Sequence, residues 1–151
     1  MRLRRARLDE GATLAEVFGA ARAGMTYLPQ LHTPEEDRWY FGEIALVSQE
    51  IWVAEEDDRV LGFTGLTDDL MSSIYVRPEA QGRGVGTALM EKAKERRPDG
   101  FSLWVFQENG GARRFYERHG FRLVRETDGA DNEERVPDAL YEWRPPAAAT
   151  G

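Results

Sequence analysis

Residues 70–87 read Leu-Met-Ser-Ser-Ile-Tyr-Val-Arg-Pro-Glu-Ala-Gln-Gly-Arg-Gly-Val-Gly-Thr. The first half of this segment is apolar and β-prone, Pro78 ends that half, and a run with three glycines then leads into helix-forming sequence. The segment therefore predicts a strand, a tight loop and a helix. Because free backbone N–H groups and the positive end of the helix dipole meet at a helix N-terminus, such a loop favours a phosphate group. Glycine lets that phosphate come close to the backbone.

Two common phosphate-binding patterns do not fit this loop. A P-loop needs a lysine and then Ser or Thr after its last glycine, whereas Gly86 is followed by Thr87 and Ala88. The dinucleotide-binding fingerprint needs glycines spaced G-x-G-x-x-G, whereas these glycines are spaced G-x-G-x-G. A glycine-rich turn before an ordinary helix stays open as an alternative at this point.

Composition and charge limit the classes of protein that fit. The chain has 151 residues, of which 41% are hydrophobic, and this suits one domain with its own core. The net charge of −7 argues against a nucleic-acid scaffold and leaves room for a cationic substrate. There is no cysteine, which excludes disulfides, thiolate zinc sites and a cysteine nucleophile, and we predict no bound metal.

Hydropathy predicts a cytoplasmic protein that does not bind membranes. No apolar run approaches the roughly 20 residues of a membrane span. The basic start of the chain is followed by no hydrophobic signal core.

Apolar periodicity predicts the order of the elements. A short edge strand is expected within residues 2–8, and a helix follows to about Ala23 with Asp9 as its cap. Thr33, Pro34 and Glu36 form the pattern of a capping box, which starts a second helix running to about Val47. Further strands are expected at 51–54, 60–66, 70–76, 101–106, 121–125 and 140–143, and further helices from Val85 to before Pro98 and over 109–119.

The connections between these elements predict one domain. Because a helical crossover joins the strands at 70–76 and 101–106, these two strands should be parallel. Residues 1–144 are expected to form a single domain, and residues 145–151 a frayed C-terminal tail.

Three separated segments resemble the GCN5-related N-acetyltransferases (GNAT). Residues 81–86, Gln-Gly-Arg-Gly-Val-Gly, match the family signature Q/R-x-x-G-x-G/A. Residues 74–78 end the strand before it, and Asn109 with Ala112, Phe115, Tyr116, Gly120 and Phe121 follows at family-like spacing. The resemblance implies an α+β fold of three layers (α/β/α), of the acyl-CoA N-acyltransferase type. Its mixed, mostly antiparallel sheet has about seven strands with four helices, and parallel strands four and five splay apart.

This resemblance implies acetyl-CoA as the co-substrate, with its pantetheine arm in the gap between the splayed strands and its pyrophosphate on the glycine loop. On this basis, the cofactor-binding residues are Ile74, Tyr75, Val76, Gln81, Gly82, Arg83, Gly84, Val85, Gly86, Thr87, Asn109, Ala112 and Phe115. Two of them have ordinary alternatives, since Arg83 also fits a solvated loop arginine and Asn109 also fits a helix N-cap.

For catalysis, Tyr116 matches the family tyrosine that protonates the departing sulfur, although packing beside Phe115 is its alternative role. Some family members carry a glutamate base on the fourth strand, but residues 70–76 offer only Ser72, Ser73 and Tyr75. A water wire, or capture of the small neutral fraction of the amine, therefore competes with any named base. A backbone N–H near Tyr75 or Val76 is the expected oxyanion donor.

Acceptor specificity is expected from the loops at 25–39 and 127–138. The candidate substrate contacts there are Tyr27, His32, Trp39, Glu133 and Glu134. The function implied is direct acetyl transfer to a primary amine of a small molecule or protein, and a non-catalytic acyl-CoA-binding or sensing module is the alternative. The family resemblance further suggests a homodimer paired through the last strands, and no nucleic-acid partner is expected.

Overall fold

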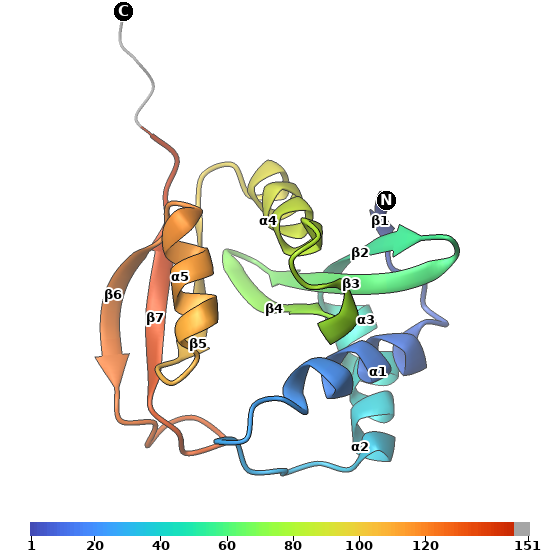
Figure 1. The fold of residues 1–151 in the computed structure, drawn as a ribbon, viewed down its shortest axis with the longest axis horizontal. Coiled ribbons are helices and arrows are strands. Elements are labelled where there is room, and N and C mark those ends of the chain that lie inside the picture. Colours follow the sequence, from blue (N-terminus) through green and yellow to red (C-terminus); the bar gives the residue numbers. More distant parts are fainter. Residues whose placement is uncertain (147–151) are drawn as a thin grey trace, which may run out of the picture.

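A seven-stranded sheet runs through the computed structural model, which describes residues 1–146 (Figure 1). Its order is β1-β2-β3-β4-β5-β7-β6, and every neighbouring pair is antiparallel except β4 with β5, which are parallel as predicted. The strands are β1 (Arg2–Arg5), β2 (Glu50–Glu56), β3 (Arg59–Thr67), β4 (Leu70–Val76), β5 (Phe101–Phe106), β6 (Arg122–Thr127) and β7 (Asp138–Trp143). Most of the tail predicted at 145–151 lies outside the described residues.

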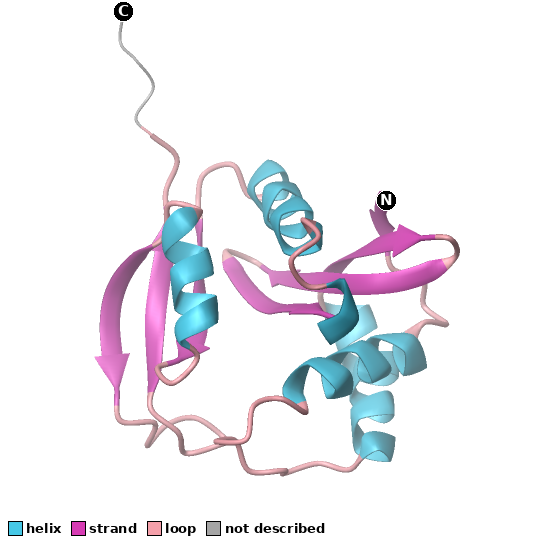
Figure 2. Cartoon of the chain, viewed as in Figure 1, coloured by secondary structure: helices cyan, strands magenta, loops and turns pink. Residues whose placement is uncertain are grey.

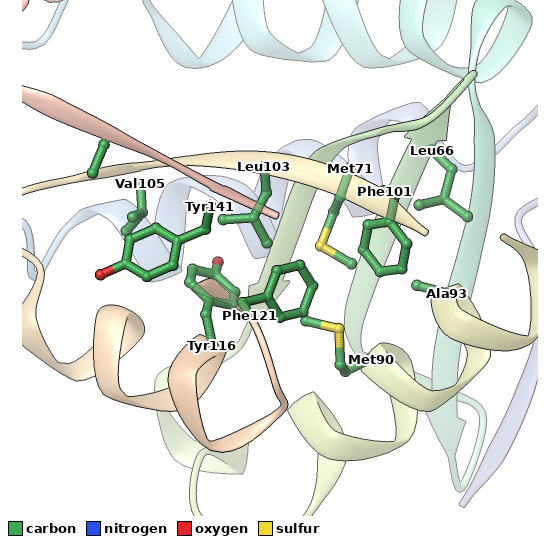
Figure 3. Packing of buried hydrophobic residues seen from close by; sticks show 11 residues of the cluster. Leu66, Met71, Met90, Ala93, Phe101, Leu103, Val105, Tyr116, Phe121 and Tyr141 are labelled. Atoms are coloured by element: carbon green, nitrogen blue, oxygen red, sulfur yellow. The ribbon is translucent and has the colours of Figure 1, made fainter. Parts of the chain in front are cut away.

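Helices cover both faces of the sheet (Figure 2). They are α1 (Gly11–Arg22), α2 (Pro34–Trp39), the π-helical turn η1 (Tyr40–Ala45), α3 (Leu46–Ser48), the 3-10 turn η2 (Pro78–Ala80), α4 (Val85–Arg96) and α5 (Gly110–Arg118). α1 and η1 pack with β2 and β3 in one core cluster, which includes Leu14, Phe41 and Phe63. α4 and α5 cover the other face over a second cluster built around Met90, Phe101 and Tyr116 (Figure 3). The three-layer α+β fold is therefore confirmed.

The first two helices begin in different ways, since α2 has a side-chain cap and α1 has none. The capping box is confirmed, because Glu36 N donates to Thr33 Oγ1 (3.1 Å) and Thr33 N donates to the Glu36 carboxylate (2.9 Å). The expected cap of α1 at Asp9 was wrong, since the N-cap residue is Glu10. Hydrogen bonds from Arg4 hold Glu10 in place and keep its pKa at about 2. The Glu10 side chain therefore pairs with β1 and makes no capping hydrogen bond to α1.

The second predicted helix is helical through Ser48 but is not regular. Its middle is the π-helical turn η1, which the apolar period did not predict. Such π-helical turns are rare and are frequent at functional sites. None of the helices in the described part of the chain has the length and hydropathy of a membrane span.

The contact between α1 and η1 predicts opposite effects for two glycine substitutions in one helix. A Cβ on Gly11 would lie 2.6 Å from Gly42 Cα, whereas a Cβ on Gly19 would have nothing within 4 Å. We expect Gly11→Ala to lower the free energy of unfolding by about 1–3 kcal/mol, because backbone must move. Gly19→Ala should raise it by about 0.5–1 kcal/mol. Urea unfolding followed by circular dichroism measures both, and a stabilised Gly11→Ala would refute this contact.

Candidate active site

The parallel strands β4 and β5 separate in the middle of the sheet. Leu70 pairs with Ser102 and Met71 with Leu103, and no further β4–β5 pair occurs in the described chain. Beyond Met71, β4 keeps β3 on one edge, while its other edge faces a gap. The gap holds a cavity of about 120 Å³, and its walls include Ile74, Tyr75, Phe106, Asn109, Ala112 and Tyr116. Exposed strand edges of this kind bind extended groups that carry amides.

A bulge in β4 sets which side chains face this region. Gly65 pairs with Ser73 and Leu66 with Met71, so Ser72 is an extra residue without a partner on β3. Across the bulge, Met71 and Ile74 both contact the core cluster beneath α4 and α5. Tyr75 instead packs with the cluster beneath α1. The Ser73 hydroxyl is buried and has no hydrogen-bond partner in the described part of the chain.

The glycine loop presents free amides at the start of α4. Gly82 and Gly84 have φ angles of 78° and 84°, and Gly84 is the N-cap residue of α4. The N–H groups of Gly82, Arg83 and Gly84 make no hydrogen bond to any residue in 1–146. Gly86 lies against Phe115 of α5, with 3.4 Å from an ideal Cβ to the Phe115 ring. The loop is therefore a ready anion-binding site at a helix N-terminus.

Arg77 anchors the beginning of this loop. Its guanidinium is buried, donates from Nε to the Val60 carbonyl (2.7 Å) and pairs with Glu16 of α1 (2.6 Å). Its backbone N–H donates to the Leu61 carbonyl (2.8 Å). These contacts fix the loop to β3, so its free amides are held in place before any ligand binds.

The other predicted cofactor residues lie in different environments. The Arg83 guanidinium is 53% exposed and pairs with Glu56 (2.7 Å), so it would have to leave Glu56 to meet a phosphate. Asn109 lines the gap and also caps α5, since Ala112 N donates to its Oδ1 (3.1 Å). Phe115 packs between Gly86 and Tyr116 and is not on the wall of the gap cavity.

Tyr116 reaches the same gap from α5. It is only 7% exposed, and its ring contacts Phe115, Phe121 and Tyr141 at centroid distances of 5.6, 5.8 and 6.4 Å (Figure 3). Its hydroxyl makes no hydrogen bond within residues 1–146, and burial raises the pKa of Tyr116 well above its usual range. The phenol therefore stays protonated at neutral pH, with its proton free for a group in the gap.

A larger cleft of about 740 Å³ lies beside β4 and shares Ser72, Ser73 and Tyr75 with the gap cavity. Four of the predicted acceptor residues are on its wall: His32, Trp39, Glu133 and Glu134. Tyr27 is not on this wall. Its ring packs against Phe106 at 6.1 Å, and its hydroxyl is buried without a partner in the described residues.

Contacts across this cleft join segments that are far apart in sequence. The His32 ring hydrogen-bonds the Glu133 carboxylate, which raises the pKa of His32. Arg22 of α1 lies 3.6 Å from the Glu134 carboxylate. Sequence reasoning missed Arg22, because nothing local signals a partner more than 100 residues away.

Gln49 was also not predicted as a residue of the site, although the position of Gly65 within a strand indicated a close neighbour. Glycine inside a strand indicates the close approach of another group. An ideal Cβ on Gly65 would collide with the Gln49 side chain and lie 2.8 Å from Ser73 Oγ. Gln49 and Ser73 therefore occupy the space that a side chain at Gly65 would take, on the wall of the larger cleft.

Three features together define an acyl-CoA N-acyltransferase fold. They are the splayed parallel strands, the glycine loop at a helix N-terminus and the tyrosine in the gap. The family model described as acetyltransferase (GNAT) domain matches residues 48–123, which is about half of the chain. The chain therefore belongs to the GNAT family.

Curated relatives agree with this assignment. Peptidyl-lysine N-acetyltransferase YiaC of Escherichia coli (strain K12) is 35% identical over 100 residues, covering 65% of this chain and 66% of YiaC. Peptidyl-lysine N-acetyltransferase YjaB of the same strain is 31% identical over 127 residues, covering 81% of this chain and 82% of YjaB. The chain thus spans slightly less than two thirds of YiaC.

The solution structure of apo YjaB from Escherichia coli shares the fold. It aligns with a TM-score of 0.77 at 24% identity, covering 94% of this chain and 96% of YjaB.

The geometry of the glycine loop makes one substitution diagnostic. An ideal Cβ on Gly84 would have nothing within 4 Å, but the φ of 84° strains any L-residue with a side chain by about 1–2 kcal/mol. The free loop of Gly84→Ala should relax away from this φ angle, and returning to it on binding would cost about the same free energy; since 1.4 kcal/mol corresponds to about a tenfold change, we expect coenzyme A binding to weaken about tenfold. Titration calorimetry with coenzyme A measures this, and Gly24→Ala, also in open space, is the control. Unchanged affinity in Gly84→Ala would count against this loop as the phosphate site.

Proposed function

We propose that this protein transfers an acetyl group from acetyl-CoA directly to the ε-amino group of lysine in a peptide or protein segment. The single observation that carries the proposal is that the strand gap and the larger cleft share a wall at Ser72, Ser73 and Tyr75. A donor in the gap and an acceptor in the cleft would therefore meet at β4. The names of YiaC and YjaB as peptidyl-lysine N-acetyltransferases support lysine as the acceptor.

The residues around the gap suit acetyl-CoA as the donor. The unpaired edge of β4 at Ile74, Tyr75 and Val76 would bind the pantetheine arm, and the orphaned Ser73 hydroxyl would gain a partner nearby. The free amides of the glycine loop would bind the pyrophosphate. The proposed cofactor set is Ile74, Tyr75, Val76, Gln81, Gly82, Arg83, Gly84, Val85, Gly86, Thr87, Asn109, Ala112 and Phe115.

The chain's own groups would divide the chemistry among them. A backbone N–H at Tyr75 or Val76 would donate to the carbonyl oxygen as negative charge develops on it. Tyr116 would then give its proton to the leaving sulfur. A phenol is a weak acid, but the burial that raises the pKa of Tyr116 also disfavours a bare thiolate in the same gap. Proton transfer to sulfur would therefore relieve a buried negative charge.

The charge of the larger cleft matches a lysine acceptor. Its wall carries Glu35, Glu36, Asp37, Glu133 and Glu134 against the basic groups of Arg22 and His32. An ammonium group would be drawn to such a wall. Its aromatic side chains, Trp39 and Tyr40, would contact the apolar part of the lysine side chain.

One sequence feature favours a second candidate function. Residues 70–76 contain no Asp or Glu that could act as a base on β4. A protein that binds acyl-CoA as a sensor, without turnover, would need none.

A homodimer and a cytoplasmic location stay predictions.

An acceptor panel separates the two functions. The purified protein is incubated with acetyl-CoA and, in turn, lysine peptides, small alkylamines and polyamines, while thiol release is measured. We expect release above the no-acceptor rate, fastest with lysine peptides because the cleft is acidic. Tight coenzyme A binding with no release for any acceptor would establish the sensor instead.

Tyr116→Phe tests the proposed acid. Removing the hydroxyl should lower kcat for acetyl transfer about 100-fold, since general acid catalysis contributes at least that much, while coenzyme A affinity stays the same. Tyr141→Phe is the control in the same cluster, because the Tyr141 hydroxyl already donates to Glu117 (2.9 Å) and points away from that of Tyr116 (Figure 3). A full rate in Tyr116→Phe would exclude the tyrosine as the acid.

A further inference from the structure

Glu134 is much less exposed to solvent than Glu133 and Glu36, two other carboxylates on the wall of the larger cleft. Its side chain is 17% exposed, whereas those of Glu133 and Glu36 are 59% and 58% exposed. It lies in the loop between β6 and β7, where loop carboxylates are usually solvated. Removing a charged carboxylate from water costs free energy unless an opposite charge or hydrogen bonds offset that cost.

Glu134 stands where three cavities meet. It lines the larger cleft, a pocket of about 350 Å³ beside α1, and a pocket of about 610 Å³ along the β5 residues Trp104 and Phe106. Trp104 and Phe106 also line the strand gap. The carboxylate is therefore placed between the acceptor cleft and the strand that bounds the donor gap.

A chain of contacts fixes this position relative to β4. Phe18 packs edge-on against Tyr75 with ring centroids 5.1 Å apart, and the Arg22 guanidinium lies over Phe18 at 5.1 Å. Arg22 in turn lies 3.6 Å from the Glu134 carboxylate. Burial raises the pKa of Tyr75, Arg22 opposes this effect, and the charge of Glu134 adds to it.

Glu134 forms an ion pair with Arg22 but accepts no hydrogen bond from the other groups around it in the described chain. The pockets that it lines also have on their walls Arg22 of α1, His32 from the loop before α2, Asp37 of α2, Tyr75 of β4, Arg125 of β6 and Asp138 of β7. His32 bonds to Glu133, and Arg22 at 3.6 Å is beyond hydrogen-bond distance. Glu134 accepts no hydrogen bond from the residues at 1–146, although a carboxylate can accept several.

We infer that Glu134 binds the ammonium group of the acceptor lysine and takes its proton, so that it is the base that β4 lacks. The inference rests on the proposed function. One proton would pass from the ammonium group to the Glu134 carboxylate, and the freed lone pair would form the C–N bond at the thioester carbonyl. The C–S bond would break as Tyr116 protonates the sulfur. The second proton lost by nitrogen would restore Tyr116 through solvent, and Glu134 would release its proton to water.

A pair of matched acceptors tests this role. One peptide carries lysine, and the other carries the same chain ending in an aminooxy group, which is uncharged at neutral pH and needs no base. We expect Glu134→Gln to lower kcat/KM about 100-fold for the lysine peptide and to leave the aminooxy peptide nearly unchanged. For Glu134→Gln, kcat/KM with the lysine peptide should rise about tenfold per pH unit. The reason is that the fraction of neutral amine rises about tenfold per unit below the lysine pKa near 10.4.

Asp131→Asn is the matched control, since Asp131 is an exposed carboxylate of the same loop and is not on the wall of the larger cleft. Coenzyme A affinity and thermal unfolding of all variants show that the fold is kept. If Glu134→Gln does not fold, Glu134→Asp replaces it, with a smaller loss confined to the lysine peptide.

Two results would overturn the inference. Equal losses for both peptides would make Glu134 merely structural, and an unchanged lysine rate would remove it from the reaction. A wild-type protein that acetylates neither peptide would refute the proposed function itself.

Discussion

The structure depends on how short the parallel pairing of β4 with β5 is. Only Leu70 with Ser102 and Met71 with Leu103 are paired, so the strand edges beyond them have no partner in the described sheet. Unpaired backbone groups need hydrogen bonds, which makes the gap a site for a ligand with amides. The cluster of Met71, Met90, Phe101 and Tyr116 beneath α4 and α5 packs both sides of the separation together, so the sheet can open without losing its core (Figure 3).

The elements around the gap each contribute one property to the site. The crossover from β4 to β5 brings the glycine loop and the N-terminus of α4 to the end of β4, where Arg77 fixes the loop on β3. α5 begins after β5 and carries Tyr116 into the gap. At and beside the β4 bulge, Ser72, Ser73 and Tyr75 line both the larger cleft and the gap cavity. The donor and acceptor sites of the proposed reaction therefore follow from one opening in the sheet.

Local signals carried most of the fold and part of the site. Features that depend on neighbouring residues in the sequence were predictable. Examples are the strand Phe101–Phe106, the capping box at Thr33 and the left-handed Gly120 after α5. The N-cap residue Glu10 was not predictable, because its side chain pairs with Arg4 of β1 and forms no local capping motif, and the apolar period did not indicate the π-helical turn η1. The pairs His32–Glu133 and Arg22–Glu134 join residues more than 100 positions apart, which periodicity cannot report.

The most direct test of this account is a crystal structure with coenzyme A. We expect the pantetheine arm between β4 and β5, hydrogen-bonded to the backbone of residues 74–76. The pyrophosphate should lie on the amides of residues 82–87, and the sulfur within reach of the Tyr116 hydroxyl. Coenzyme A bound elsewhere, with the gap between β4 and β5 unfilled, would contradict it.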